Sequence, residues 1–220
     1  MAVAAVLSAV FQFVKVSTES RAAYNPGRQK IIVDAGHGGG DGGAVSDSGL
    51  LEKELNLELS LTLRDMLCAA GYDVIMTRSD DSMLTWEARR AQNQAICART
   101  EIASANPDAL FVSIHMNKFP SASVHGVQLY YSPNHPASKS IASAIRDGVR
   151  AQLQPWNERP LKEAGSNIYV LDRIRSPAVL VECGFLSNAG EAAMLSHAEY
   201  RQALALVICS SLLDYLDKAG

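Results

Sequence analysis

Three short apolar runs in this chain each lead into a residue that can bind a metal ion or carry a proton. The runs are 31–33, which enters a glycine-rich loop containing His37, 111–114, which precedes His115, and 178–181, which precedes Glu182. Apolar runs of this length are typical of buried strands. Because the carboxyl ends of parallel strands lie at one edge of a sheet, we expect the three polar side chains to lie close together there.

Strand-like and helix-like segments alternate along the rest of the chain. Strands are expected at 30–33, 73–77, 109–114, 127–131, 167–171 and 178–181, and helices at 53–70, 84–104, 137–153 and 200–216. Such alternation is typical of an α/β fold, in which helices connect parallel strands and cover both faces of the sheet. We therefore predict one domain with a twisted, mostly parallel sheet of about six strands.

Composition and charge narrow the class of protein further. The chain has 220 residues, 48% of them hydrophobic, which is enough apolar material for one sizeable core. Its formal net charge is -3 and its basic residues are scattered, which argues against a nucleic-acid partner. Cys68 and Cys209 lie in apolar helical patterns and are predicted to be buried free thiols. Cys183 should point to the opposite face of its strand from Glu182.

The first 27 residues are predicted to precede the catalytic domain. Residues 2–14 form an apolar run that is shorter than the roughly 20 residues needed to span a bilayer, and no basic segment precedes it. Two interpretations stay open. The run is either the remnant of an export signal or membrane anchor, which would tether the protein to a membrane, or a helix packed on the domain. Pro26 and Gly27 interrupt the chain, so the domain is placed at 28–220.

The residues at the strand ends make a candidate metal site. Zinc in hydrolytic sites takes three protein ligands and leaves a fourth position to water, and His37, Glu52 and His115 are of the right types. Glu52 is expected at the start of a helix, where the helix dipole favours a carboxylate. Glu182 would then move a proton from water to a leaving amine, as in an amide hydrolase. The long spacings, without an H-E-x-x-H motif, leave open that the histidines only cap or pack the strands.

A second motif in the same loop points to another class of protein. Gly38, Gly40 and Gly43 match the spacing of the dinucleotide-binding fingerprint G-x-G-x-x-G. In that motif the helix starts at the third glycine and directs its N-terminus at a pyrophosphate. Here the helix is expected to start after residue 49, which is too late, so we disfavour a nucleotide cofactor.

Five blocks of the sequence together resemble the zinc-dependent N-acetylmuramoyl-L-alanine amidases of the Amidase_3 family. The blocks are Val33 to Ala44, Glu52, Thr77-Arg78, Ser113 to Asn117, and Val181 to Asn188. The resemblance covers about residues 29–216. It implies that His37, Glu52 and His115 bind one zinc ion per chain and that Glu182 is the catalytic carboxylate. The implied substrate is peptidoglycan, at the amide between the lactyl group of N-acetylmuramic acid and L-alanine.

Softer features are most similar to the germination-type, spore-cortex members of that family. They are the segments 98–102 and 166–171 and the lack of an added wall-binding module. This similarity implies a role in cortex maturation through muramic-lactam formation, and action outside the cytoplasmic membrane, in the cell wall or cortex space. Between residues 117 and 182 no long helical insertion is predicted, so autoinhibition by such a helix is not expected. An activating partner protein stays open.

The substrate contacts and the exact reaction are less constrained. Asn117, Arg78 and Asn167 are candidates for binding substrate, although Arg78 and Arg99 also suit a role in holding loops. Asp34 is a candidate for orienting the metal-binding histidines. Two alternative functions remain: a zinc endopeptidase or carboxypeptidase of peptidoglycan, which would use the same chemistry on another amide, and a non-catalytic module that binds muropeptide.

Overall fold

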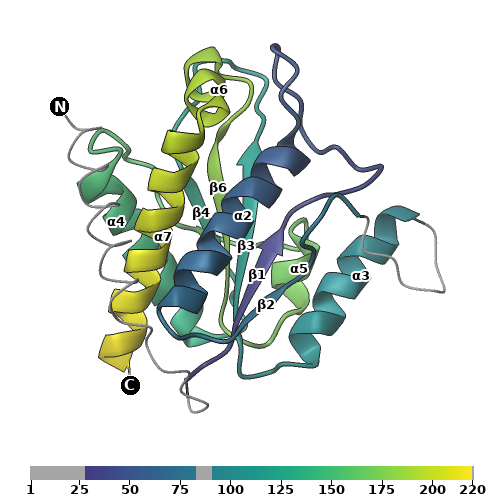
Figure 1. The fold of residues 1–220 in the computed structure, drawn as a ribbon, viewed down its shortest axis with the longest axis vertical. Coiled ribbons are helices and arrows are strands. Elements are labelled where there is room, and N and C mark those ends of the chain that lie inside the picture. The colour runs from purple at the N-terminus through teal and green to yellow at the C-terminus, as the bar shows by residue number, and fades with distance from the viewer. Residues whose placement is uncertain (1–27, 83–90, 220) are drawn as a thin grey trace.

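The computed structural model describes residues 28–82 and 91–219, which form a sheet between two layers of helices (Figure 1). The strands are β1 (Ile31–Ala35), β2 (Val74–Met76), β3 (Leu110–Asn117), β4 (Gln128–Tyr131), β5 (Lys162–Glu163) and β6 (Ala178–Phe185). The helices are α2 (Glu52–Ala69), α3 (Ala91–Ser104), α4 (Pro136–Gln152), α5 (Tyr169–Arg173), α6 (Ala189–Ser196) and α7 (Ala198–Ala219).

The described strands form one six-stranded sheet in the order β2-β1-β3-β6-β4-β5. Strands β2, β1, β3 and β6 are parallel, and β4 pairs with β6 in the antiparallel direction. The predicted mostly parallel α/β sheet is thus confirmed. Because β1, β3 and β6 are neighbours, their carboxyl ends lie side by side, and the register pairs His115 with Glu182.

One face of the sheet carries the larger core. The alternation of side chains along a strand sends Ile31 and Val33 to this face, together with Val112, Ile114 and Val181. They pack against α2, α4 and α7, which cover this side of the sheet (Figure 1). Cys183 is fully buried in this core, on the opposite face from Glu182 as predicted.

The other face carries a smaller core under α3 and α5. Ile32, Phe111 and Leu180 pack there with Ala103 and Leu171. The next inward positions along the same strands are polar: Asp34 follows Ile32, Ser113 and His115 follow Phe111, and Glu182 follows Leu180. This face is therefore apolar near the start of the strands and polar at their carboxyl ends.

The prediction of a strand at 167–171 is wrong. Residues 167 and 168 lie in a loop, and residues 169–171 form the start of the short helix α5. The β-branched residues of this segment suggested a strand, but tertiary contacts decide the outcome. Leu171 is fully buried in the smaller core, and its carbonyl accepts hydrogen bonds from Ser132 and Asn134. The two-residue strand β5, which pairs with β4, was not predicted.

Other expectations have mixed outcomes. Cys209 is buried as predicted, whereas Cys68 is exposed, because it lies on the solvent side of α2. The predicted helix at 84–104 is described only from Ala91, and the N-terminal segment 1–27 lies outside the described residues. None of the helices in the described ranges is long and apolar enough to cross a membrane.

Candidate metal centre and catalytic cleft

The chain leaves β1 in an unusual backbone conformation that presents His37. The φ angle of His37 is 61°, in the left-handed region that residues other than glycine rarely adopt. Two buried arginines hold the main chain on either side of it. Arg99 Nη2 donates to the carbonyls of Ala35 and His37, and Arg78 donates through Nε to Ala35 and through Nη2 to Gly36. Strain of this kind persists at functional sites where the surroundings fix it.

Glu52 is fixed at the first turn of α2. The residue is 3% exposed, and its Oε2 accepts a hydrogen bond of 2.8 Å from the Ala44 amide. Its Oε1 accepts one of 3.1 Å from the amide of Met116, on β3. This carboxylate therefore joins the glycine-rich loop to the end of β3.

The three predicted metal ligands meet at one point. Glu52 Oε1 lies 2.9 Å from His115 Nδ1 and 3.2 Å from His37 Nε2, and one ligand atom from each residue lies within 4.8 Å of the others. Zinc bonds of about 2.0–2.2 Å place ligand atoms of one ion roughly 3–4 Å apart, close to this spacing. Imidazole nitrogen and carboxylate oxygen are common donors to zinc. The residues present thus fit a single divalent ion.

Two glycines of the loop give the ligands their space. A Cβ atom on Gly36 would lie 2.3 Å from the His115 ring, and one on Gly43 would lie 2.6 Å from Glu52 Oε2 and 2.7 Å from His37. Gly43 also has a φ of 65°. The glycine-rich loop therefore encloses the ligand set. Helix α2 begins at Glu52, well past the third glycine, as expected, and this late start argues against the nucleotide-binding interpretation.

The charges at the site are strongly coupled. Burial alone would lower the pKa of His37, but hydrogen bonds and charge from Glu52 and Asp41 raise it to about 9. Burial would raise the pKa of Glu52, but the two histidines hold the pKa of this carboxyl well below its usual range. The site therefore keeps a carboxylate ionised beside two imidazoles, and a cation at this point would be stabilised by it.

The partner that orients His37 is Asp41 and not Asp34. Asp41 Oδ2 lies 2.8 Å from His37 Nδ1, which leaves Nε2 to face the ligand set. Asp34 accepts hydrogen bonds from Thr77, Ser113 and Arg99 at 2.6–2.7 Å. Burial would raise the pKa of Asp34, but Arg99, the charge of His115 and the two hydroxyls lower it. Asp34 thus ties β1 to β3 and α3 beneath the ligands.

Glu182, unlike the three ligand residues, has a carboxylate oxygen without a hydrogen-bond partner among the described residues. This oxygen, Oε2, is buried. Burial raises the pKa of Glu182 to about 7, and the charge of His115 only partly opposes this. Glu182, His37 and His115 all line a cleft of about 360 Å³, whose other walls include Asn167 and Tyr169.

The candidate substrate contacts occupy three different environments. Asn167 is exposed and lines the cleft. Asn117 is partly exposed at the end of β3, beside an irregularity in the pairing with β6. Arg78 is 4% exposed, and its donors reach the carbonyls of four residues, namely Ala35, Gly36, Lys53 and Asp80. These bonds favour the loop-holding interpretation of Arg78 over contact with substrate.

Sequence reasoning missed Asp41, the two spacing glycines and Tyr169. Asp41 lies four residues after His37 in a loop of small residues, which was the available signal for a hydrogen-bond partner. The role of Gly36 depends on a ring that approaches from a distant strand, and no local signal shows it. The strand predicted at 167–171 includes Tyr169, so the pattern does not indicate its place on the wall of the cleft.

Comparisons with known proteins agree with this geometry. The profile of a family described as N-acetylmuramoyl-L-alanine amidase matches residues 31–214. The germination-specific N-acetylmuramoyl-L-alanine amidase of Bacillus subtilis is 34% identical over 194 residues, which cover 86% of this chain and 81% of that protein. The CwlD amidase of Clostridioides difficile, solved in complex with the GerS lipoprotein, has a TM-score of 0.82 at 36% identity and covers 87% of this chain and 100% of that chain. The catalytic domain of CwlV from Bacillus (Paenibacillus) polymyxa has a TM-score of 0.72 at 31% identity, with 86% and 98% covered.

Proposed function

Because the chain belongs to the N-acetylmuramoyl-L-alanine amidase family, we propose that His37, Glu52 and His115 bind one zinc ion and that Glu182 transfers the proton of the reaction. The reaction is hydrolysis of the amide between the lactyl group of N-acetylmuramic acid and L-alanine of the stem peptide. The observation that carries the proposal is the meeting of three ligand atoms within 4.8 Å beside a buried carboxylate oxygen that has no partner among the described residues.

A zinc ion bound there would polarise the scissile carbonyl and make a water molecule acidic enough to attack it near neutral pH. The protein residues hold the ligands in place for this. Asp41 fixes the ring of His37, and the amides of Ala44 and Met116 fix the carboxylate of Glu52. A site that is organised before substrate arrives needs little rearrangement during the reaction.

Glu182, whose Oε2 has no hydrogen-bond partner among the described residues, would carry the proton. Its carboxylate accepts a proton from the attacking water while the oxygen of that water forms a bond to the carbonyl carbon. When the carbon–nitrogen bond breaks, Glu182 donates the proton to the nitrogen of the departing L-alanine. The products are a muramic carboxylate and a stem peptide with a free amine. Asn167, on the wall of the cleft, and Asn117, at the end of β3, would hydrogen-bond the muropeptide.

We further propose that the protein acts outside the cytoplasmic membrane, in maturation of spore cortex. The similarity to a germination-specific amidase supports this role. The similarity to CwlD, which was solved with the GerS lipoprotein, supports an activating partner of that kind. Residues 1–27 would provide export or a membrane tether.

The proposal is tested by digestion of purified cortex peptidoglycan, followed by mass assignment of the released ends. We expect new free amines on L-alanine, and their loss with a chelator. Replacing Glu182 with Gln should lower kcat by about 10²–10⁴-fold, which is the usual contribution of a general acid–base group. E163Q, which changes an exposed carboxylate on β5, is the matched control and should retain full activity.

Two results would contradict the proposal. Cleavage inside the stem peptide, without release of L-alanine amines, would assign an endopeptidase or carboxypeptidase. Substantial amidase activity in E182Q would remove Glu182 from its role.

A further inference from the structure

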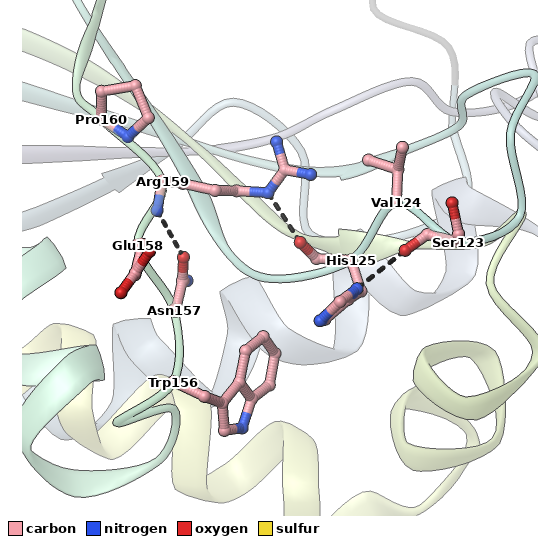
Figure 2. Close-up of a pocket in the computed structure, with 8 residues that line it drawn as sticks. All are labelled: Ser123, Val124, His125, Trp156, Asn157, Glu158, Arg159 and Pro160. Atoms are coloured by element: carbon pink, nitrogen blue, oxygen red, sulfur yellow. Dashed lines mark hydrogen bonds between the residues drawn. The ribbon is translucent and has the colours of Figure 1, made fainter.

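A second hollow shares no lining residue with the catalytic cleft, and the reaction proposed above does not use it. Figure 2 shows this hollow, which has a volume of about 410 Å³ and is open to solvent. Two loops form its walls, one between β3 and β4 and the other between α4 and β5. Its lining residues are Ser123, Val124, His125, Trp156, Asn157, Glu158, Arg159 and Pro160.

The hollow presents an aromatic surface with hydrogen-bonding groups around it. Trp156 is 48% exposed, which is unusual for so large an apolar side chain, and the His125 ring lies 4.8 Å from it at an angle of 44°. His125 Nδ1 bonds the carbonyl of Ser123 at 2.8 Å, so Nε2 is the nitrogen left for a ligand. Glu158 is exposed at the same wall and offers carboxylate oxygens.

Buried contacts hold this hollow in shape. Asn157 Nδ2 donates to the carbonyl of Val127 at 2.9 Å, and Asn157 Oδ1 accepts from the amide of Arg159. Arg159 Nε donates to the carbonyl of His125 at 2.7 Å, and its guanidinium lies 4.5 Å from the centre of the buried Phe185 ring. Figure 2 shows the second and third of these polar links: Asn157 and His125 each joined to Arg159. Because the two walls are bonded to each other, the site is formed before any ligand binds.

The hollow is connected to the catalytic face of the sheet through one residue. Gln128, on β4, pairs in register with Glu182, so the two side chains lie on the same face. Gln128 Oε1 accepts a hydrogen bond of 3.4 Å from Arg159 Nη1. Arg159, on the wall of the hollow, is therefore bonded to the residue that pairs with Glu182.

We propose that this hollow binds a sugar of the glycan strand, an uncharged N-acetylated hexose stacked on Trp156. This inference rests on the proposed function, because the amide that is cleaved hangs from a sugar of that strand. The C–H face of a hexose ring is apolar and packs on indole, while its rim of hydroxyl and amide groups needs donors and acceptors. His125, Glu158 and Arg159 supply both. The opposite charges of Glu158 and Arg159 do not select for an anion or a cation, which favours a neutral ligand.

The test measures binding of tetra-N-acetylchitotetraose, a neutral glycan without lactyl group or peptide, to the zinc-loaded protein by calorimetry. We expect W156A to weaken binding about tenfold, which corresponds to the loss of one aromatic stacking contact of about 1.4 kcal/mol. F119A removes an aromatic side chain that is equally exposed but lies outside the hollow, and it should bind like the wild type. W156F, which keeps a ring, should retain most of the affinity, and H125A should lose part of it.

A second measurement compares two substrates. W156A should lower kcat/KM about tenfold on long glycan strands and leave it unchanged on a single disaccharide-peptide, which has no further sugar to place in the hollow. The inference is overturned if the wild type does not bind the oligosaccharide, or if W156A and H125A both bind it as the wild type does. Because the probe has no amide between a lactyl group and L-alanine, oligosaccharide binding without amidase activity would overturn the proposed function alone.

Discussion

On the face covered by α2, α4 and α7, the central strands contribute apolar side chains along their whole length, whereas on the face covered by α3 and α5 the same strands end in polar ones. Val33 and Asp34 are adjacent on β1, yet one packs in the larger core and the other bonds Arg99. The period of two along a strand makes this division possible. One face can therefore provide stability while the other holds groups that would weaken a core.

The largest expected effect on stability comes from the polar face itself. Replacing Asp34 with Asn leaves Arg99 buried without its ionic partner and should cost about 3–5 kcal/mol of unfolding free energy. Because folding lowers the pKa of Asp34, its stabilisation is complete above the unfolded value near 3.8 and is lost as pH falls from there toward the folded pKa. Urea unfolding should show a wide gap between wild type and D34N at neutral pH that narrows in acid. If the difference in unfolding free energy between wild type and D34N does not change with pH, the charge of Asp34 does not stabilise the fold.

On the apolar face, Leu59→Ala should separate stability from chemistry. Leu59 is fully buried in the larger core, so its truncation should cost about 2–5 kcal/mol. The zinc affinity of the folded protein should not change. Leu61→Ala, on the outer side of the same helix, is the control and should cost roughly 1 kcal/mol. A loss of zinc affinity in L59A would mean that the two faces are coupled.

Asp41→Asn is expected to change zinc affinity and to leave stability almost unchanged, the reverse of Leu59→Ala. Removing the charge that orients His37 should weaken zinc binding by about 10–100-fold, as for other residues behind a metal ligand. The unfolding free energy should change by less than about 0.5 kcal/mol, because the Asp41 side chain is 47% exposed. Titration with a competing chelator measures the affinity, and D47N, at an exposed acid of the same loop, is the control. Equal affinity in D41N and wild type would exclude the orienting role.

The smallest effect concerns the free cysteines. Cys68→Ser should change the unfolding free energy by less than about 0.5 kcal/mol, since Cys68 is exposed on α2. Cys209→Ser places a hydroxyl in the larger core and should cost about 1–3 kcal/mol. Thermal unfolding of both variants measures the difference. Similar melting temperatures would contradict the burial assigned to the two thiols.

The amino-acid pattern predicts the strands of the sheet well, because β1, β3 and β6 are short apolar runs whose ends are marked by polar residues. It fails at α5, where the sequence Asn-Ile-Tyr-Val-Leu favours a strand and contacts from Ser132 and Asn134 decide otherwise. The four residues proposed for chemistry are identifiable by type and position at strand ends. Their supports are not: the bond from Arg99 to His37 joins residues 62 positions apart, and the clash that makes Gly36 necessary involves a ring on another strand.

In our proposal His37, Glu52 and His115 form one zinc site, and Glu182 lies outside it. The most direct test is the zinc content of purified protein after dialysis, measured by elemental mass spectrometry. We expect one zinc per chain in the wild type and in E182Q, and almost none in H115A. Stoichiometric zinc in H115A, or a loss of zinc in E182Q equal to that in H115A, would contradict this set of ligands.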